Sequence, residues 1–286
     1  MTSRSAVESR TITKFSPSQV RTVEDDLTVE EPLEIRLAVH RPDQDPEERI
    51  AVTMRTPGDD FELAVGFLFT EGLLHSYRDI QSIRYCQTEK AAHRGNVVRV
   101  QLRAGVDVDT QRLRGHSYRN SSCGLCGRAS IEAVQVPPTV KHQAPATPCL
   151  HPSALYTLTE TLRQQQVVFQ RTGSIHAAGL FAADGQLLLL YEDVGRHNAV
   201  DKLIGAALIR GWLPLREYCI IVSGRAGFEL VQKSVVAGLG MMGAVGAPSN
   251  LAVALAEEYG MALVGFIKRR GVNIYTGDFS ATTVSS

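Results

Sequence analysis

Two short runs without a charged residue, Tyr218–Val222 and Ala262–Ile267, most constrain how this chain can fold. Strands that lack a polar face are buried on both sides, as in a sheet that helices cover from above and below. Helical spacing of apolar residues precedes and follows these runs, and Asp184-Gly185 marks a hairpin between two further apolar segments. The second half is therefore predicted to be α/β, with strands and helices in alternation.

In the first half, apolar and polar residues alternate with the two-residue period that is typical of half-buried strands. Apolar and polar residues alternate over 33–39, 50–54 and 98–102, and a helical pattern lies between Asp59 and Gly72. Residues 1–25 are polar and show no periodicity. We therefore predict a flexible N-terminal extension over 1–25 and a strand-rich α+β domain over 26–115.

Composition excludes several classes of protein. Thirty basic residues balance thirty acidic ones among 286, which gives no field for nucleic acid or an anionic membrane. No run approaches the roughly 18 apolar residues of a membrane span. The start of the chain lacks an apolar signal core, and five cysteines are too scattered for a disulfide framework. These features predict a cytoplasmic location and a buried, unreactive role for Cys219.

A reactive dithiol is predicted at Cys123-Gly124-Leu125-Cys126-Gly127. The glycines favour a mobile loop, and no acidic residue occurs between Gln111 and Ile131, where Arg112, Arg114, Arg119, Arg128 and His116 all fall. A cationic neighbourhood favours the thiolate, the form that attacks sulfur or binds a metal. Proline-rich sequence follows, so we predict a mobile cysteine loop and linker over 116–148 and the α/β domain over 149–286.

Spacing alone leaves three roles for the cysteine pair. The pair could be half of a zinc site, although no second Cys-x-x-Cys and no ligand-like histidine spacing accompany it. It could be a redox dithiol, although that motif normally follows a strand and opens a helix. It could also be a sulfur carrier, in which one thiolate accepts a sulfane sulfur on a mobile arm.

Glycine-rich turns in the second half suggest an anion site. The turns at 173–176, 192–198 and 223–227 lie at strand and helix ends, where backbone N–H groups can receive phosphate. The cations Lys268-Arg269-Arg270 follow the last apolar strand, at the edge where α/β sheets hold ligands. Together they predict a pyrophosphate or nucleotide site, although each turn alone can be a purely structural feature.

The same blocks resemble the FdhD/NarQ family of formate dehydrogenase accessory sulfurtransferases. The resemblance covers about residues 30–278 and rests on Cys-Gly-x-Cys-Gly at 123–127 and on further blocks in the family's order. These blocks are 173–178, 192–202, 223–225, 246–249, 264–266 and 273–276.

This resemblance implies a homodimeric sulfur carrier that requires two protein partners, a cysteine desulfurase and formate dehydrogenase. It would take persulfide sulfur on Cys123, with Cys126 assisting, and deliver it to the bis-molybdopterin guanine dinucleotide molybdenum cofactor. The resemblance places that cofactor against Phe266, Ile267, Lys268, Arg269, Arg270 and Gly271, with no bound metal of its own. It also implies that the larger domain has the three-layer fold of cytidine deaminase.

Two rival functions remain open. A zinc deaminase needs a glutamate two residues after its zinc-binding histidine, but His176 is followed by Ala177-Ala178. The cysteine pair also precedes this histidine rather than following it. A non-catalytic chaperone for the cofactor would need the basic site but not the thiols. Asp193 and His197 could assist at the cofactor or merely stabilise the start of a helix.

Overall fold

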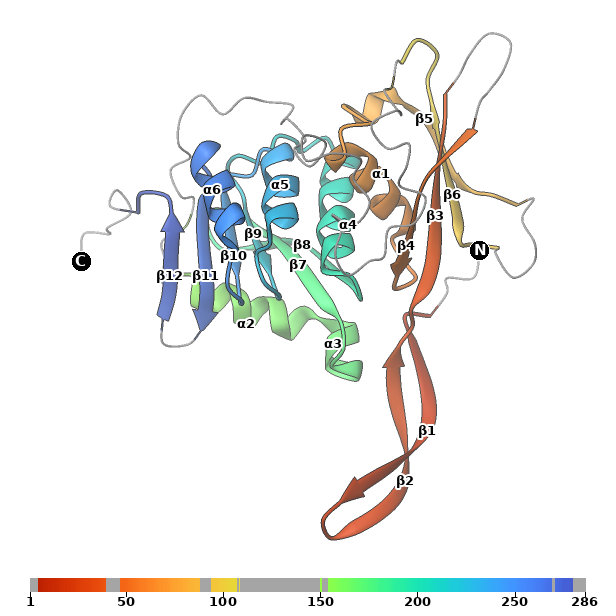
Figure 1. Cartoon of the computed structure of the whole chain (residues 1–286), viewed down its shortest axis with the longest axis vertical. Coiled ribbons are helices and arrows are strands. Elements are labelled where there is room, and N and C mark those ends of the chain that lie inside the picture. Colours follow the sequence, from red (N-terminus) through yellow and green to blue (C-terminus); the bar gives the residue numbers. More distant parts are fainter. Residues whose placement is uncertain are drawn as a thin grey trace.

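The computed structural model describes residues 5–39, 47–87, 94–106, 108, 150, 154–268 and 271–279. It is a mixed α/β structure with two main sheets and a separate two-stranded arm (Figure 1). The predicted cysteine loop and linker, 116–148, lie outside the described residues.

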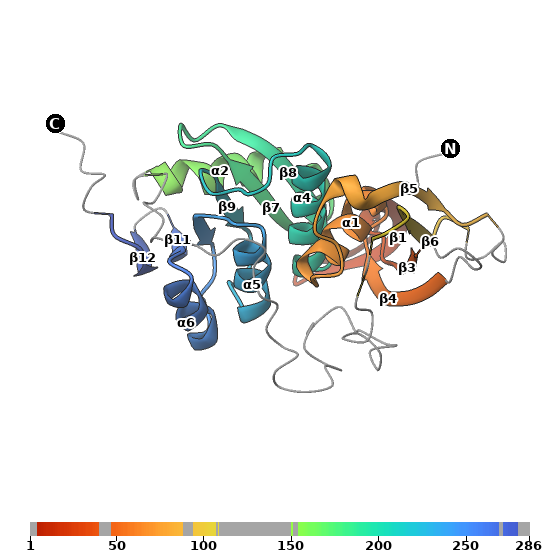
Figure 2. The ribbon, with the colours of Figure 1, turned by 90° about the horizontal axis from the view of Figure 1, so that it is seen from above.

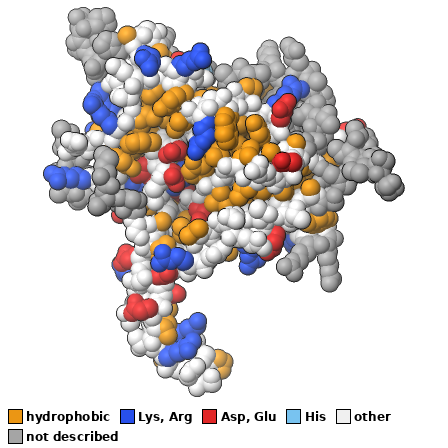
Figure 3. All heavy atoms as spheres, turned by 180° about the vertical axis from the view of Figure 1, so that it is seen from behind, with side chains coloured by type: hydrophobic (Ala, Val, Ile, Leu, Met, Phe, Trp, Pro, Cys, Tyr) orange, Lys and Arg blue, Asp and Glu red, His pale blue; other side chains and the backbone are white. Residues whose placement is uncertain are grey.

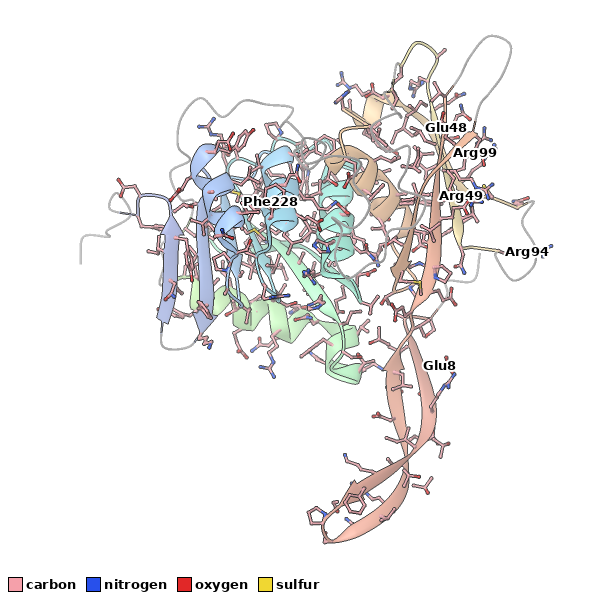
Figure 4. All side chains as sticks on the ribbon, viewed as in Figure 1. Glu8, Glu48, Arg49, Arg94, Arg99 and Phe228 are labelled. Atoms are coloured by element: carbon pink, nitrogen blue, oxygen red, sulfur yellow. The ribbon has the colours of Figure 1, made fainter. Side chains whose placement is uncertain are left out.

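The N-terminal sheet has four strands in the order β4-β3-β6-β5. The strands are β3 (Glu31–Ala38), β4 (Glu47–Arg55), β5 (Ile80–Tyr85) and β6 (Val97–Leu102). The hairpin β3–β4 and the strand β6 confirm the alternating pattern, in which one face is buried against helix α1 (Asp60–Thr70). The labelled side chains Arg49 and Arg99 lie on the side of this sheet away from α1 (Figure 4).

The C-terminal sheet has six strands in the order β12-β11-β10-β9-β7-β8. They are β7 (His176–Phe181), β8 (Leu187–Asp193), β9 (Cys219–Val222), β10 (Met241–Ala244), β11 (Ala262–Lys268) and β12 (Gly271–Thr276). Strands β9, β10 and β11 are parallel, so their carboxyl ends share one edge. The hairpin β7–β8 and the two apolar strands, now β9 and β11, confirm the sequence prediction.

Helices cover both faces of this sheet. Figure 2 shows α2 (Leu155–Gln165) on one side and α5 (Phe228–Val236) and α6 (Asn250–Glu258) on the other. Helix α4 (Arg196–Ile209) joins the α5 side, and the short α3 (Val167–Thr172) follows α2. Two apolar cores result, and Cys219 is fully buried in the one beneath α2, as predicted for a small hydrophobic residue.

The two sheets are joined through a close crossing of α1 and α4, which we call the helix junction. A Cβ atom on Gly66 would lie 1.8 Å from the carbonyl oxygen of Asp201, and one on Gly205 would lie 1.9 Å from that of Glu62. Only glycine permits this approach. One continuous core therefore extends from the N-terminal sheet to the sheet under α4 and α5.

An ion pair crosses the helix junction inside this core. The ammonium of Lys233 on α5 lies 2.8 Å from a carboxylate oxygen of Asp201 on α4. It also donates to the hydroxyl of Thr70 at the end of α1, which in turn donates to Asp201. Asp201 and Lys233 are almost completely buried, so each charge depends on the other for compensation.

The N-terminal arm differs from the flexible extension expected over residues 1–25. Strands β1 (Val7–Ser16) and β2 (Gln19–Thr28) pair antiparallel and project from the body (Figure 1). The pattern was missed because none of these side chains is fully buried, so no apolar face repeats along the strands. Cross-strand hydrogen bonds, as between Ser9 and Asp26, replace burial. At its base, Asp26 pairs with Arg171 of α3 at 2.8 Å.

Candidate functional site

A cavity of about 640 Å³ opens at the edge of the six-stranded sheet where β9, β10 and β11 end. Ser223, Val245 and Lys268 line it from these three strand ends. His176 lines it from the start of β7, which runs antiparallel to β9 and so begins at the same edge. Helices α2 and α3 form the opposite wall through Thr159, Glu160, Leu162, Arg163, Gln166 and Phe169.

All four of the glycine-rich or cationic segments singled out in the sequence meet in this cavity, with Val194 contributed by the turn at 192–198. Ser174 and His176 come from the first turn, Ser223 from the third, and Ile267 and Lys268 from the cationic segment. The hydroxyl of Ser223 accepts a hydrogen bond from the backbone N–H of Ala177 at 2.9 Å, which fixes the turn after β9 beside the start of β7. Segments far apart in sequence thus converge because the sheet brings their strand ends together.

His176 is half-buried at the floor of the cavity. Burial lowers the pKa of its imidazole from the ordinary value of 6.5, and the nearby Arg196 and His197 lower it further, while Asp193 opposes them. The ring is therefore neutral at pH 7 and offers one donor and one acceptor. Gly224 lies beside the ring, and a Cβ there would be in ordinary van der Waals contact with it at 3.5 Å.

Gln166 forms the bend between α2 and α3, and its side chain is 3% exposed. Its amide nitrogen Nε2 is buried and has no hydrogen-bond partner among the described residues, and the residue is one of those that line the cavity. A buried donor without an acceptor is costly, so such groups are rare in folded proteins. Close by, the guanidinium of Arg163 lies 6.0 Å from the ring centroid of Phe169.

Backbone strain occurs at the end of β11. Phe266 has φ of +51°, in the left-handed region that non-glycine residues seldom occupy, at a cost of about 1 to 3 kcal/mol. A register shift between β11 and β12 spans Gly265 to Lys268, and the N–H of Phe266 donates to the carbonyl of Gly246 at 3.0 Å. The bulge leaves the ring of Phe266 partly exposed, with the ammonium of Lys268 5.6 Å from its centroid.

Asp193 and His197 occupy structural positions beside the cavity. Asp193 is fully buried, 2.8 Å from the ammonium of Lys202, and accepts from the N–H groups of Thr56 and Gly195 and from the amide of Asn198. Burial raises the pKa of its carboxyl, which Lys202 opposes. His197 lies 3.0 Å from Glu229 at the start of α5. These contacts favour the structural interpretation of both residues.

The sequence-predicted site residues are only partly brought together by the described structure. Ile267 and Lys268 line the cavity, Phe266 lies at the adjoining bulge, and Gly271 begins β12. Cys123, Cys126, Arg269 and Arg270 lie outside the described residues, so their assignment stays a prediction.

The wall formed by α2 and α3 was missed by sequence reasoning. The spacing of Leu155, Leu158 and Leu162 is typical of one apolar helix face, and these leucines form the buried face of α2. The opposite residues gave no signal, because Gln166 stands in a run of three glutamines and only the fold distinguishes it from its exposed neighbours. Helix α3 begins Val167-Val168-Phe169, a composition typical of strands.

The described parts of the chain offer neither a cluster of metal ligands nor a membrane-spanning helix. They contain no group of three or more His, Cys, Asp or Glu side chains placed to hold a metal ion. None of their helices has the length and apolar character needed to cross a bilayer.

Comparison with known proteins identifies the family. The model of the FdhD/NarQ family matches residues 28–281. A protein named sulfur carrier protein FdhD from Streptomyces coelicolor is 48% identical over 274 residues, covering 94% of both chains. A protein of the same name from Saccharolobus solfataricus is 38% identical over 255 residues, covering 88% of this chain and 89% of its own.

A solved structure shares the fold at lower sequence identity. The putative formate dehydrogenase accessory protein from Desulfotalea psychrophila matches with a TM-score of 0.69 and 21% identity, over 96% of this chain and 98% of its own. This match supports the mixed α/β arrangement alone. The family model and the relatives lead to one assignment: the chain belongs to the FdhD/NarQ family.

Proposed function

We propose that this protein is a sulfur carrier that serves formate dehydrogenase, and that it acts as a sulfurtransferase on the molybdenum cofactor of that enzyme. The observation that carries the proposal is the convergence of Ser174, His176, Ser223 and Lys268 on one cavity at the carboxyl edge of the sheet. Ser174 and His176 come from the family-like block at 173–178 and Ser223 from the block at 223–225, while Lys268 comes from the cationic segment. The names of the relatives, with near 50% identity over most of the chain, support the same activity.

Sulfur loading follows thiol–disulfide exchange chemistry. The thiolate of Cys123 attacks the terminal sulfur of a persulfide held by a cysteine desulfurase, the sulfur–sulfur bond of the donor breaks, and the donor cysteine leaves as thiolate. Cys123 then carries the persulfide, and no net oxidation occurs. The arginines around it in sequence favour the thiolate that this step needs.

Delivery needs two electrons, which the second cysteine can supply. Attack of the Cys126 thiolate on the Cys123 sulfur releases hydrosulfide to the metal of the cofactor and leaves a Cys123–Cys126 disulfide. A thiol reductant then restores both thiols. The cofactor is the acceptor substrate of this step.

We place the binding site for the nucleotide part of the molybdenum cofactor, the bis-molybdopterin guanine dinucleotide, in this cavity. Lys268 and Arg163 supply positive charge, His176 supplies a neutral donor and acceptor, and Phe169 and Ile267 supply apolar surface. Arg269, Arg270 and Gly271 complete the proposed contact segment that begins at Phe266. The strained backbone of Phe266 is typical of a residue held for ligand contact.

We also propose that the protein acts as a homodimer. Seen from behind, hydrophobic side chains gather across the middle of one face (Figure 3). Large apolar areas on soluble proteins commonly mark protein contacts. Light scattering after size-exclusion chromatography tests this proposal, and a monomer at micromolar concentration would contradict it.

Persulfide loading is tested directly by intact-mass spectrometry. After incubation with a cysteine desulfurase and cysteine, the wild type should gain about 32 Da, one sulfur atom, in a form that a reductant removes. Cys123→Ala should gain nothing, while Cys86→Ala serves as the matched control and should load normally. A Cys123→Ala protein that still restores formate dehydrogenase activity would replace this mechanism with that of a non-catalytic cofactor chaperone.

A further inference from the structure

Gln166 lines the cavity and carries a buried hydrogen-bond donor without an acceptor among the described residues. The side chain is 97% buried, yet its Nε2 has no acceptor among the described residues, while its backbone carbonyl is used within α3 by the N–H of Gln170. The preceding glutamines, Gln164 and Gln165, are exposed. The chain thus buries one glutamine of three against a cavity and leaves its donor unpaired.

The surroundings of this donor fit a flat, mostly apolar ring. Phe169, Ile175 and Ile267 line the same cavity, and its volume of about 640 Å³ lies within the usual range of small-molecule sites. Glu160 is the acidic residue among those that line the cavity, and it adds a carboxylate acceptor to the lining. A ligand ring there needs an acceptor for Gln166 and can offer donors to Glu160.

We propose that Gln166 is a specificity-determining residue that donates a hydrogen bond from Nε2 to the ring carbonyl of a guanine base. The inference rests on the proposed function, because it assumes that the cavity holds the nucleotide part of the cofactor. Guanine carries a carbonyl acceptor at position 6 and donors at the adjoining N1 and N2 positions. Adenine carries an amino group at position 6 instead, which would place two donors against each other.

Discrimination between guanine and adenine follows from the unpaired Nε2 donor of Gln166 rather than from the shape of the cavity. A site that must satisfy a buried donor rejects an analogue that cannot accept from it, because the penalty of the unpaired donor persists in the wrong complex. Guanine binding would satisfy Nε2, and adenine binding would leave it buried and unpaired. The protein should therefore bind guanosine diphosphate more tightly than adenosine diphosphate.

The test compares the affinities of both nucleotides by isothermal titration calorimetry. The full-length wild type should bind guanosine diphosphate at least about tenfold more tightly than adenosine diphosphate. Gln166→Met, which keeps the length of the side chain but removes the donor, should lose this preference through weaker binding of the guanine nucleotide alone. Gln165→Met, its exposed neighbour, is the matched control and should behave as wild type.

Thermal unfolding without ligand separates recognition from a merely structural role. If Nε2 is unpaired in the free protein, Gln166→Met should be at least as stable as wild type, because no hydrogen bond is lost. A lower melting temperature for Gln166→Met alone would show that the amide is paired inside the protein and would overturn the inference.

The binding data also distinguish failure of this inference from failure of the proposed function. If the wild type and Gln166→Met bind guanosine diphosphate with equal affinity, another residue recognises the base. That result overturns this inference alone. Equal weakening of both nucleotides by Gln166→Met also overturns it, since the base would not be discriminated. If the wild type binds neither nucleotide, the nucleotide site of the proposed function falls as well.

Discussion

The helix junction and the cavity are both built around buried polar groups, but the two regions treat those groups differently. At the junction, the ammonium of Lys233 is paired with Asp201 and hydrogen-bonded to Thr70, and glycines let the helices touch. At the cavity, Gln166 keeps an unpaired donor and Phe266 keeps a strained backbone. A region that only holds the fold can satisfy every polar group, and the unsatisfied donor and strained backbone at the cavity are what the proposed ligand site would require.

Removing the ammonium of Lys233 should give the largest loss of stability. Lys233→Met leaves the carboxylate of Asp201 buried without compensation, at a cost of about 3 to 5 kcal/mol of unfolding free energy. Urea unfolding followed by circular dichroism measures it. Arg10→Ala, which breaks an exposed pair with Glu8 on the arm, is the control and should not change stability. Equal midpoints for both variants would mean that the junction does not depend on this pair.

A methyl group at the helix crossing should have the next largest effect. Gly205→Ala places a Cβ on the carbonyl oxygen of Glu62 and forces α1 and α4 apart, for an expected loss of about 1 to 3 kcal/mol. The control is Gly227→Ala, where no heavy atom lies within 4 Å of the added carbon. Matching unfolding curves for the two alanine variants would contradict the close packing described for the junction.

At the cavity, changes should affect ligand binding rather than stability. Lys268→Ala removes a charged donor that the proposed function places against phosphate oxygens, so the affinity for guanosine diphosphate should fall about tenfold. Calorimetry at low ionic strength gives the affinity, and Lys14→Ala on the arm controls for net charge. An unchanged affinity would remove Lys268 from the nucleotide site.

The smallest expected effect is the pH dependence that His176 contributes. The pKa of this imidazole is lower in the folded protein than the ordinary 6.5, so the unfolded chain binds more protons just below that pH. Its contribution to stability is therefore complete above about pH 6.5 and is lost as the pH falls further. Melting temperatures between pH 7.5 and 5.5 should decline less steeply for His176→Asn. Parallel declines for the two proteins would rule out a depressed pKa.

Sequence patterns predicted the elements whose burial repeats with a regular period. The β3–β4 and β7–β8 hairpins, α1, α4 and the apolar strands β9 and β11 were all anticipated in this way. Strand β10 was not, because Met241-Met242-Gly243-Ala244 is short and lacks β-branched residues. The arm was missed because its strands pair with each other and bury no side chain completely.

Part of the candidate site could also be predicted from the sequence. Ser223, His176 and Lys268 were singled out because glycine turns and cations at strand ends favour anion binding, and they do line one cavity. Gln166 could not be found this way, since its importance lies in a hydrogen bond that the folded chain fails to make. An unpaired donor of this kind can be identified only in the folded structure, where each donor can be matched with the acceptors around it.

The shared core at the helix junction has a consequence for how the chain can be divided. Residues 5–106 and 154–279 are joined in sequence through 107–153, but they are held together by the crossing of α1 and α4 and by the core that both halves complete. A single cut between Asp109 and Cys149 would therefore break the polypeptide and leave the fold assembled. Two separately made fragments should complement each other into one particle, with neither half stable alone, and we expect the intact protein to unfold in one cooperative transition despite its two sheets.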